Sequence, residues 1–134
     1  MPRPNTSPQR ARRSSGKAPR RFTHAHRQRL ERAIKHYLKH CYRRATSARV
    51  SECAALIGLT VPYLSRIAPK ILGVPLLDAM RKHQVAYAVQ LLRTTPLHVE
   101  EIAIRAGFGS VPALYRWFRA VHGTTPGAFR EVKK

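Results

Sequence analysis

The sequence predicts an all-α fold in which two copies of one helix-turn-helix unit are joined by a long helix. Apolar residues recur every three to four positions along most of the chain, which is the spacing of an amphipathic helix. The stretch from 50 to 68 returns in similar form at 99 to 118. Between the copies lies a segment with helical spacing that is bounded by prolines.

The charge of the chain indicates its partner. In 134 residues, 26 Lys and Arg stand against 6 Asp and Glu, so the formal net charge is +20. A chain of this length is expected to hold one domain or two very small ones, without a deep catalytic pocket. Such an excess of positive charge repels itself unless a polyanion binds it, and nucleic acid is the usual one. An anionic membrane surface is the competing partner.

Signals for export or membrane insertion are missing from the sequence. No run of about 18 apolar residues occurs, and the basic start of the chain is not followed by an apolar stretch. We therefore expect no membrane partner and a cytoplasmic protein that is found at the nucleoid. Cys41 and Cys53 are expected to be reduced thiols in that compartment.

Residues 1–22 hold seven basic residues and no acidic one among proline, serine and glycine. This composition buries too little apolar surface to offset chain entropy, so we predict a disordered basic arm. It either binds phosphates nonspecifically, which we favour, or is an inert tail.

An amphipathic helix is predicted to follow, with Thr23 as its N-cap. Its apolar side consists of Leu30, Ile34, Leu38, Cys41 and Ala45, and its other side carries Arg29, Arg32, Lys35, Lys39 and Arg43. That charged side is either solvated or faces phosphates. His36, His40 and Cys41 are close in sequence, but no further ligand set has metal spacing, so neither a metal nor a cofactor is expected.

The repeated unit reads as helix, glycine turn, helix. The matching pairs are Val50 and Val99, Glu52 and Glu101, Ala54 and Ala103, Gly58 and Gly107, Leu64 and Leu114, and Arg66 and Arg116. The two glycines are expected at the end of each first helix with positive φ. Thr60 and Ser110 are expected to cap the second helices, and Pro62 and Pro112 to lie in their first turns.

The segment between the copies is predicted to be one long helix. It runs from 75 to 95, opens with a proline and ends before Pro96. About 18 helical residues span roughly 27 Å, which is of the order of the 34 Å between successive major-groove faces of B-DNA. After the second copy, Gly123 should end a helix and Thr125 should cap a last one, whose Phe129 plugs the second core.

A helix-turn-helix places its second helix in the major groove of DNA. The segments "LLRTTPLHVEEIAIRAGFGS" and "LYRWFRAVHGTTPGAFR" resemble the C-terminal signature of the AraC/XylS family of bacterial transcription regulators. The resemblance implies a seven-helix tandem helix-turn-helix domain with two three-helix subdomains and a linker helix. The expected parts are the arm 1–22, a first subdomain 23–74, the linker helix 75–95 and a second subdomain 96–134.

The same resemblance implies which residues face DNA. They are Pro62, Ser65 and Arg66 in the first motif, and Val111, Pro112, Tyr115 and Arg116 in the second. Arg66 and Arg116 are the strongest candidates for base or phosphate contact, because a guanidinium group matches guanine or phosphate oxygens with two hydrogen bonds. Arg81 and Arg119 are expected to contact phosphates.

Four positions depart from the family pattern, one of which is Pro62 in place of a side chain that often reaches DNA. Ala68 and Pro69 replace a phenylalanine and a basic residue, and Gln84 stands where a basic residue is frequent. Proline removes an amide and clashes with the carbonyl of Ser65, so the first recognition helix should kink or end early. We expect the first motif to read DNA sequence weakly.

The predicted function is a sequence-specific transcription regulator, not an enzyme, that binds double-stranded DNA as a monomer with two recognition helices in successive major grooves. RNA polymerase is a second candidate partner. The first alternative is a nonspecific architectural nucleic-acid binder. The second is the DNA-recognition subunit of a mobile-element enzyme whose catalytic chain is separate.

Overall fold

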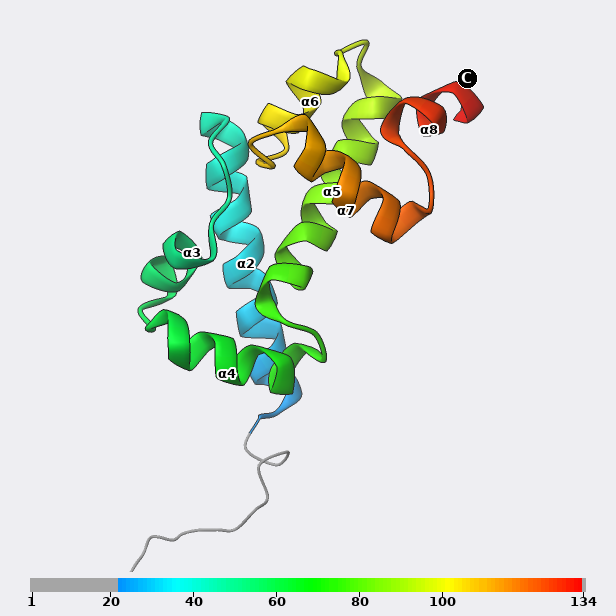
Figure 1. The fold of residues 1–134 in the computed structure, drawn as a ribbon. Helices are drawn as coiled ribbons and strands as arrows, with labels where there is room; N and C mark the ends of the chain where they lie inside the picture. Colours follow the sequence, from blue (N-terminus) through cyan, green and yellow to red (C-terminus); the bar gives the residue numbers. More distant parts are fainter. Residues whose placement is uncertain (1–21, 134) are drawn as a thin grey trace, which may run out of the picture.

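Residues 22–133, which the computed structural model describes, fold into seven helices and no strand (Figure 1). The helices are α2 (His24–Arg44), α3 (Val50–Ile57), α4 (Val61–Leu72), α5 (Leu76–Thr94), α6 (Val99–Arg105), α7 (Val111–His122) and α8 (Pro126–Lys133). The predicted all-α tandem helix-turn-helix class is confirmed. The predicted basic arm, apart from Phe22, lies outside the described residues.

Helix α2 begins at the predicted cap. The Thr23 side chain accepts a hydrogen bond from the backbone N–H of His26, and the His26 ring accepts one from the backbone N–H of Thr23. Tyr37, buried in the core, donates its hydroxyl proton to Glu52 at 2.6 Å and accepts from the backbone N–H of Arg49 at 2.9 Å. These two bonds fix α3 against α2, and burial is the main cause that raises the pKa of Tyr37.

The two helix pairs of the repeat form as predicted. Helices α3 and α4 meet at 88°, which is the sharp corner that a helix-turn-helix requires. Gly58 and Gly107 have φ of +90° and +79°, a region in which an L side chain is strained. Thr60 and Ser110 each accept a hydrogen bond at 3.3 Å from the backbone N–H three residues on, and each second helix carries its proline in the first turn.

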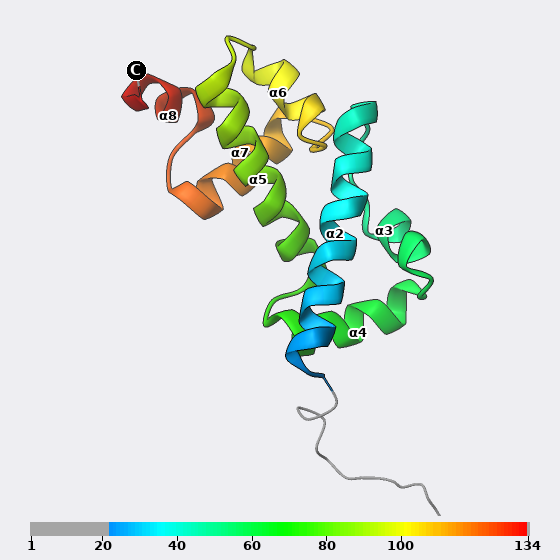
Figure 2. The ribbon, with the colours of Figure 1, turned by 180° about the vertical axis from the view of Figure 1, so that it is seen from behind.

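Helix α5 is the central element and contacts α2, α4, α6, α7 and α8 (Figure 2). Its 19 residues span about 28 Å. Its first turns bury Leu76, Ala79 and Met80 in an apolar cluster with α2, α3 and α4. Its later turns bury Val85, Ala88, Leu91 and Leu92 in a second apolar cluster with α6 and α7. One rigid rod therefore anchors both helix-turn-helix units.

The end of the chain closes the second cluster. Thr125 accepts a hydrogen bond from the backbone N–H of Ala128, and the Phe129 ring lies edge-on to Phe118, with 5.5 Å between the ring centres. The predicted plug is confirmed. Arg130 adds a contact that the sequence analysis missed. Its guanidinium group donates to the carbonyl oxygens of Leu92 in the last turn of α5, of its C-cap Thr95, and of Leu97.

The prediction that Pro69 ends the first recognition helix early is wrong. Helix α4 continues through Pro69 to Leu72 and ends at Gly73. The lost amide costs one hydrogen bond to Ser65, but Leu64, Ala68 and Leu72 on the same helix are buried in the first cluster. Burial of that apolar stripe keeps the last turn helical against the preference of proline.

Candidate nucleic-acid interface

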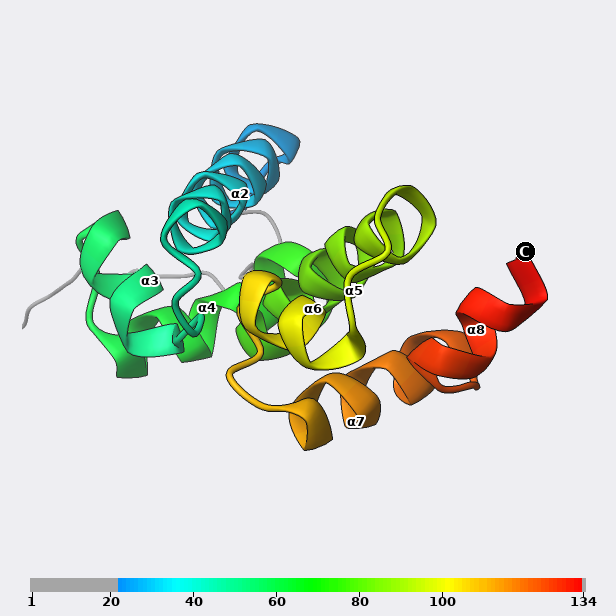
Figure 3. The same cartoon turned by 90° about the horizontal axis from the view of Figure 1, so that it is seen from above.

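Helices α4 and α7 lie on the same side of the molecule. In Figure 1 both run in front of the long helices behind them, and in Figure 2, seen from behind, α2 and α5 are in front instead. In the view from above, α2 lies at one edge and α7 at the other, with α4 between them (Figure 3). We call the side formed by the exposed faces of α4 and α7 the recognition side.

Helix α4 exposes the residues that the sequence analysis selected. Pro62, Ser65 and Arg66 are all exposed, at a spacing that puts them on one face of the helix. The Arg66 guanidinium carbon lies 5.2 Å from the centre of the Tyr63 ring, an arrangement that favours a cation–π contact. Tyr63 is itself 41% exposed. Sequence reasoning missed it, although an aromatic residue one turn before the selected arginine was the available signal.

Helix α7 has the same division into two faces. Leu114 and Phe118 are fully buried, whereas Pro112, Arg116 and Arg119 are exposed. The remaining selected residues, Val111 and Tyr115, are half-buried at the edge of the exposed face. The selected residues of this motif therefore follow one another along a single strip of the helix.

Arg81, the remaining selected residue, lies between the two units. Its Nη1 donates to the side-chain oxygen of Gln84 at 2.8 Å and to the carbonyl of Ala48 at 3.5 Å, and its guanidinium carbon is 5.8 Å from the centre of the Phe108 ring. Burial lowers the pKa of Arg81, and its Nε is buried without a hydrogen-bond partner. Its contact with phosphate stays a prediction, and these contacts already give it a structural role.

Gln84 was read from the sequence only as a departure from a pattern. It is fully buried, and its amide nitrogen donates to the carbonyl of Ala106 at 2.9 Å. The backbone N–H of Ala48 donates to the carbonyl of Gly107 at 2.9 Å beside it. We call Ala48, Arg81, Gln84, Ala106 and Gly107 the seam, because their hydrogen bonds join the first unit to the turn of the second.

Residues 22–133 contain neither a cluster of metal-binding side chains nor a single membrane-spanning helix. No group of three or more His, Cys, Asp or Glu side chains within residues 22–133 could hold a metal ion. In the same range, no single helix is long and apolar enough to cross a membrane. Helices α3 and α4 together have the length and composition of a membrane span, but the pair is bent by 88°. These two helices are the first helix-turn-helix, whose apolar stripe is buried in the core.

The chain matches a known protein family. The model of a family described as a helix-turn-helix domain matches residues 53–131, more than half of the chain. The chain belongs to the AraC-type helix-turn-helix family. Members of this family are DNA-binding transcription regulators. The resemblance seen in the sequence is thereby confirmed.

Two curated relatives cover a similar part of the chain. The HTH-type transcriptional activator AarP of Providencia stuartii is 32% identical over 81 residues, which is 60% of this chain and 60% of AarP. The Transposon Tn10 TetD protein of Escherichia coli is 30% identical over 65% of this chain and 63% of its own length. The match thus spans less than two thirds of each relative.

Solved AraC-type structures share the fold. The DNA-binding domain of AdpA, a global transcriptional factor crystallised with a target DNA, superposes with a TM-score of 0.67 at 28% identity and covers 77% of this chain and 90% of that one. The C-terminal domain of the response regulator yesN from Fusobacterium nucleatum gives a TM-score of 0.65 at 27% identity, over 76% of this chain and 98% of that one. The individual DNA contacts stay predictions for this chain.

Proposed function

We propose that the protein is a sequence-specific transcription regulator that binds one DNA duplex as a monomer, with α4 and α7 in successive major grooves. The observation that carries this proposal is that α4 and α7, which both carry exposed arginines, lie on the same side of the molecule (Figures 1 and 2) and are joined by a rod of about 28 Å. Successive major-groove faces recur about every 34 Å. The AdpA domain, similar in fold, was crystallised with its target DNA, which supports the same partner here.

In this arrangement each recognition helix contributes one arginine to base reading. Arg66 and Arg116 are exposed on the recognition side, and a guanidinium group can form two hydrogen bonds with guanine. Arg119 lies one turn further along α7 and is proposed to contact phosphate. The cytoplasm, at the nucleoid, is the compartment in which such a protein meets its DNA.

The second motif is proposed to carry most of the sequence preference. On α4, Pro62 and Pro69 occupy exposed positions with no hydrogen-bonding side chain, which leaves Ser65 and Arg66 to contact base edges. The contact of Arg66 with the Tyr63 ring further restrains its guanidinium group. On α7, Tyr115 and Arg116 lie next to each other and can reach adjacent bases.

Selection from a pool of random duplexes tests the proposal. We expect enrichment of a motif with two parts about 10 base pairs apart. Replacing Arg116 by Ala should cost about 1–3 kcal/mol on the selected site and relax preference at one position. Arg105→Ala is the matched control, since Arg105 is exposed on α6 and paired with Glu101 at 2.8 Å.

A nonspecific architectural binder is the competing outcome, and the net charge of +20 is the observation that favours it. Such a protein would enrich no motif, and Arg105→Ala would weaken binding as much as Arg116→Ala. The affinity would also fall steeply with salt in the same way for every duplex, because phosphate contacts dominate.

A further inference from the structure

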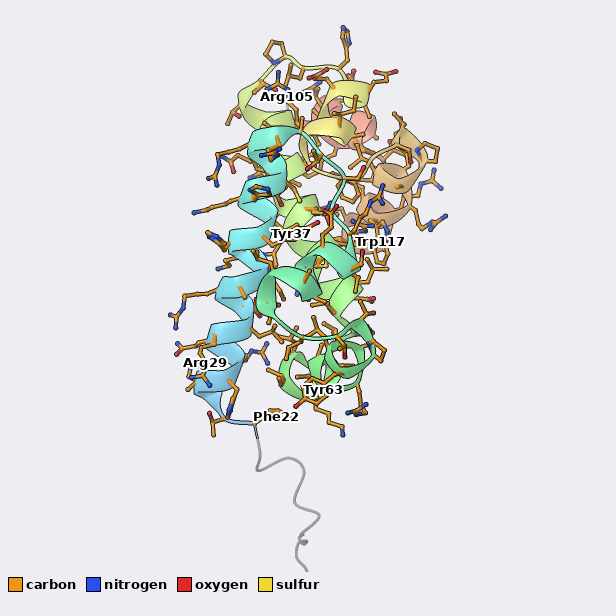
Figure 4. The ribbon with its side chains drawn as sticks, turned by 90° about the vertical axis from the view of Figure 1, so that its left-hand side faces the viewer. Phe22, Arg29, Tyr37, Tyr63, Arg105 and Trp117 are labelled. Atoms are coloured by element: carbon orange, nitrogen blue, oxygen red, sulfur yellow. The ribbon has the colours of Figure 1, made fainter. Side chains whose placement is uncertain are left out.

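Helix α2 carries a second basic surface away from the recognition side. We define the α2 basic face as seven exposed residues that helical periodicity places on one side of α2: Arg29, Arg32, Lys35, His36, Lys39, His40 and Arg43. Figure 4 places α2 along one edge of the molecule, with Arg29 at that edge and α7 at the opposite edge. A duplex held on the recognition side therefore does not reach this face.

The cations of the α2 basic face have no acidic partners. Within residues 22–133 the ion pairs are His83 with Glu31 at 3.2 Å and Arg105 with Glu101, and neither involves the face. Glu31 is the sole acidic residue of α2, and it lies on the flank toward α5, against His83. Like charges three and four residues apart destabilise a helix. The sequence thus maintains an unfavourable row of charges that an anionic partner would neutralise.

The chemistry of the face fits a phosphate backbone better than a protein. The large apolar side chains that the described structure exposes are Leu56, Val61, Tyr63, Val74, Ile104 and Val121, and none of them lies on α2. Protein interfaces centre on such apolar or aromatic anchors. From Arg29 to Arg43 the row is about 21 Å long. One strand of DNA presents about six phosphates over that length.

We propose that the α2 basic face binds the phosphate backbone of a second DNA duplex, so that one molecule bridges two segments of DNA. This inference rests on the proposed function, because the first duplex occupies the recognition side. Binding at α2 is independent of sequence, since the contacts are charges on phosphates and no base edge is read. The shallow groove of about 240 Å³ between α2 and α5, with Lys35 and Lys39 on its rim, adjoins the face.

A two-duplex capture experiment with the full chain tests the proposal. A duplex carrying the selected site is fixed to beads and saturated with protein, and a fluorescent duplex of unrelated sequence is then added. The test variant combines Arg32→Gln, Lys35→Gln, Lys39→Gln and Arg43→Gln. The control variant removes the same charge from exposed positions outside α2 and outside the proposed DNA contacts, through Arg49→Gln, Lys82→Gln, Arg93→Gln and Arg105→Gln.

We expect the natural protein and the control variant to capture the second duplex, and the α2 variant to lose at least about tenfold of the capture. The slope of log affinity for the second duplex against log salt should fall by about 3.6 in the α2 variant, since each lost phosphate contact removes about 0.9. Affinity for the single selected duplex should change less than about twofold, and circular dichroism should show an unchanged fold.

Equal capture by the α2 variant would overturn the inference, and so would an equal loss in the control variant, which would assign the effect to net charge. Bridging by two protein copies, seen as a doubled protein mass in mass photometry, would overturn it as well. The binding of the single selected duplex, measured before the second duplex is added, tests the proposed function separately. If the protein still prefers the selected duplex but does not capture the second one, this inference is wrong and the proposed function stands.

Discussion

Replacing Gln84 by Leu should loosen the joint between the two helix-turn-helix units. Gln84 is fully buried and makes two hydrogen bonds within the seam: it donates to the carbonyl of Ala106 at 2.9 Å, and it accepts from Arg81 of the same helix at 2.8 Å. Leucine has a similar volume but can make neither bond. The carbonyl of Ala106 then lacks this donor, and the partly buried Arg81 loses its shortest hydrogen bond.

The expected loss follows from these two bonds. A hydrogen bond to a charged group contributes about 1.5–3 kcal/mol, and leaving a buried carbonyl unsatisfied costs about 1–3 kcal/mol. The added apolar burial of leucine offsets part of this sum. We therefore expect the free energy of unfolding to fall by about 2–4 kcal/mol, which for a domain of this size lowers Tm by roughly 10 °C or more.

Urea and thermal unfolding of Gln84→Leu and Gln90→Leu measure the effect. Gln90 is the matched control because it lies on α5 as well but is exposed, and the bond that Thr94 donates to it uses its backbone carbonyl. Gln90→Leu should change stability by less than about 0.5 kcal/mol. Equal stability of the two variants would refute the role of the seam.

Three further predictions concern the turns, the caps and the buried thiol. Gly107→Ala should lower the Tm of the protein more than Gly58→Ala does. Both glycines have positive φ, but only at Gly107 would an added Cβ meet another group, the Gln84 amide nitrogen at 3.1 Å. Equal losses of Tm would contradict this. Ser110→Ala should cost about 1 kcal/mol in urea unfolding through loss of the α7 cap, and an unchanged midpoint would count against the cap. Burial raises the pKa of the Cys53 thiol from 9.0 to about 11. Between pH 9 and pH 11 the thiol therefore keeps its proton in the folded state and loses it in the unfolded state. Stability should therefore fall as pH rises through this window, and less so in Cys53→Ala; parallel pH profiles would exclude the thiol as a cause.

Much of the fold could be predicted because local chemistry and global structure agree. The helix-capping hydroxyl groups of Thr60 and Ser110, the prolines in the first turns and the glycines at the corners each have a local cause that can be read from the sequence. Apolar spacing likewise identified Leu30, Ile34 and Leu38 as the buried side of α2. The internal repeat strengthened the prediction, because both copies show the same pattern of helix, glycine turn and helix.

The remaining features depend on contacts between distant segments. Gln84 and Arg81 join parts of the chain that lie far apart in sequence, and no local pattern marks their partners at Ala48 and Ala106. The one available signal was a polar residue within the apolar stripe of α5. Pro69 was misjudged for the related reason that burial of α4 outweighs the local preference of proline.

The same limit applies to the DNA contacts, which stay predictions. The structure shows that Arg66 on α4 and Arg116 and Arg119 on α7 are exposed. Their partners on DNA depend on a second molecule, whose base sequence and groove width the chain does not encode in any local pattern.

The spacing between the two halves of the selected DNA site tests the central claim most directly. Binding of the natural protein should be measured on the selected duplex, on one with 5 base pairs inserted between the halves, and on one with 10 inserted. A rigid α5 predicts that the 5-base-pair insertion, which turns the second half to the opposite face of the duplex, abolishes the contribution of that half, and that the 10-base-pair insertion does not restore it. Equal affinity for all three duplexes would contradict two recognition helices held at a fixed distance.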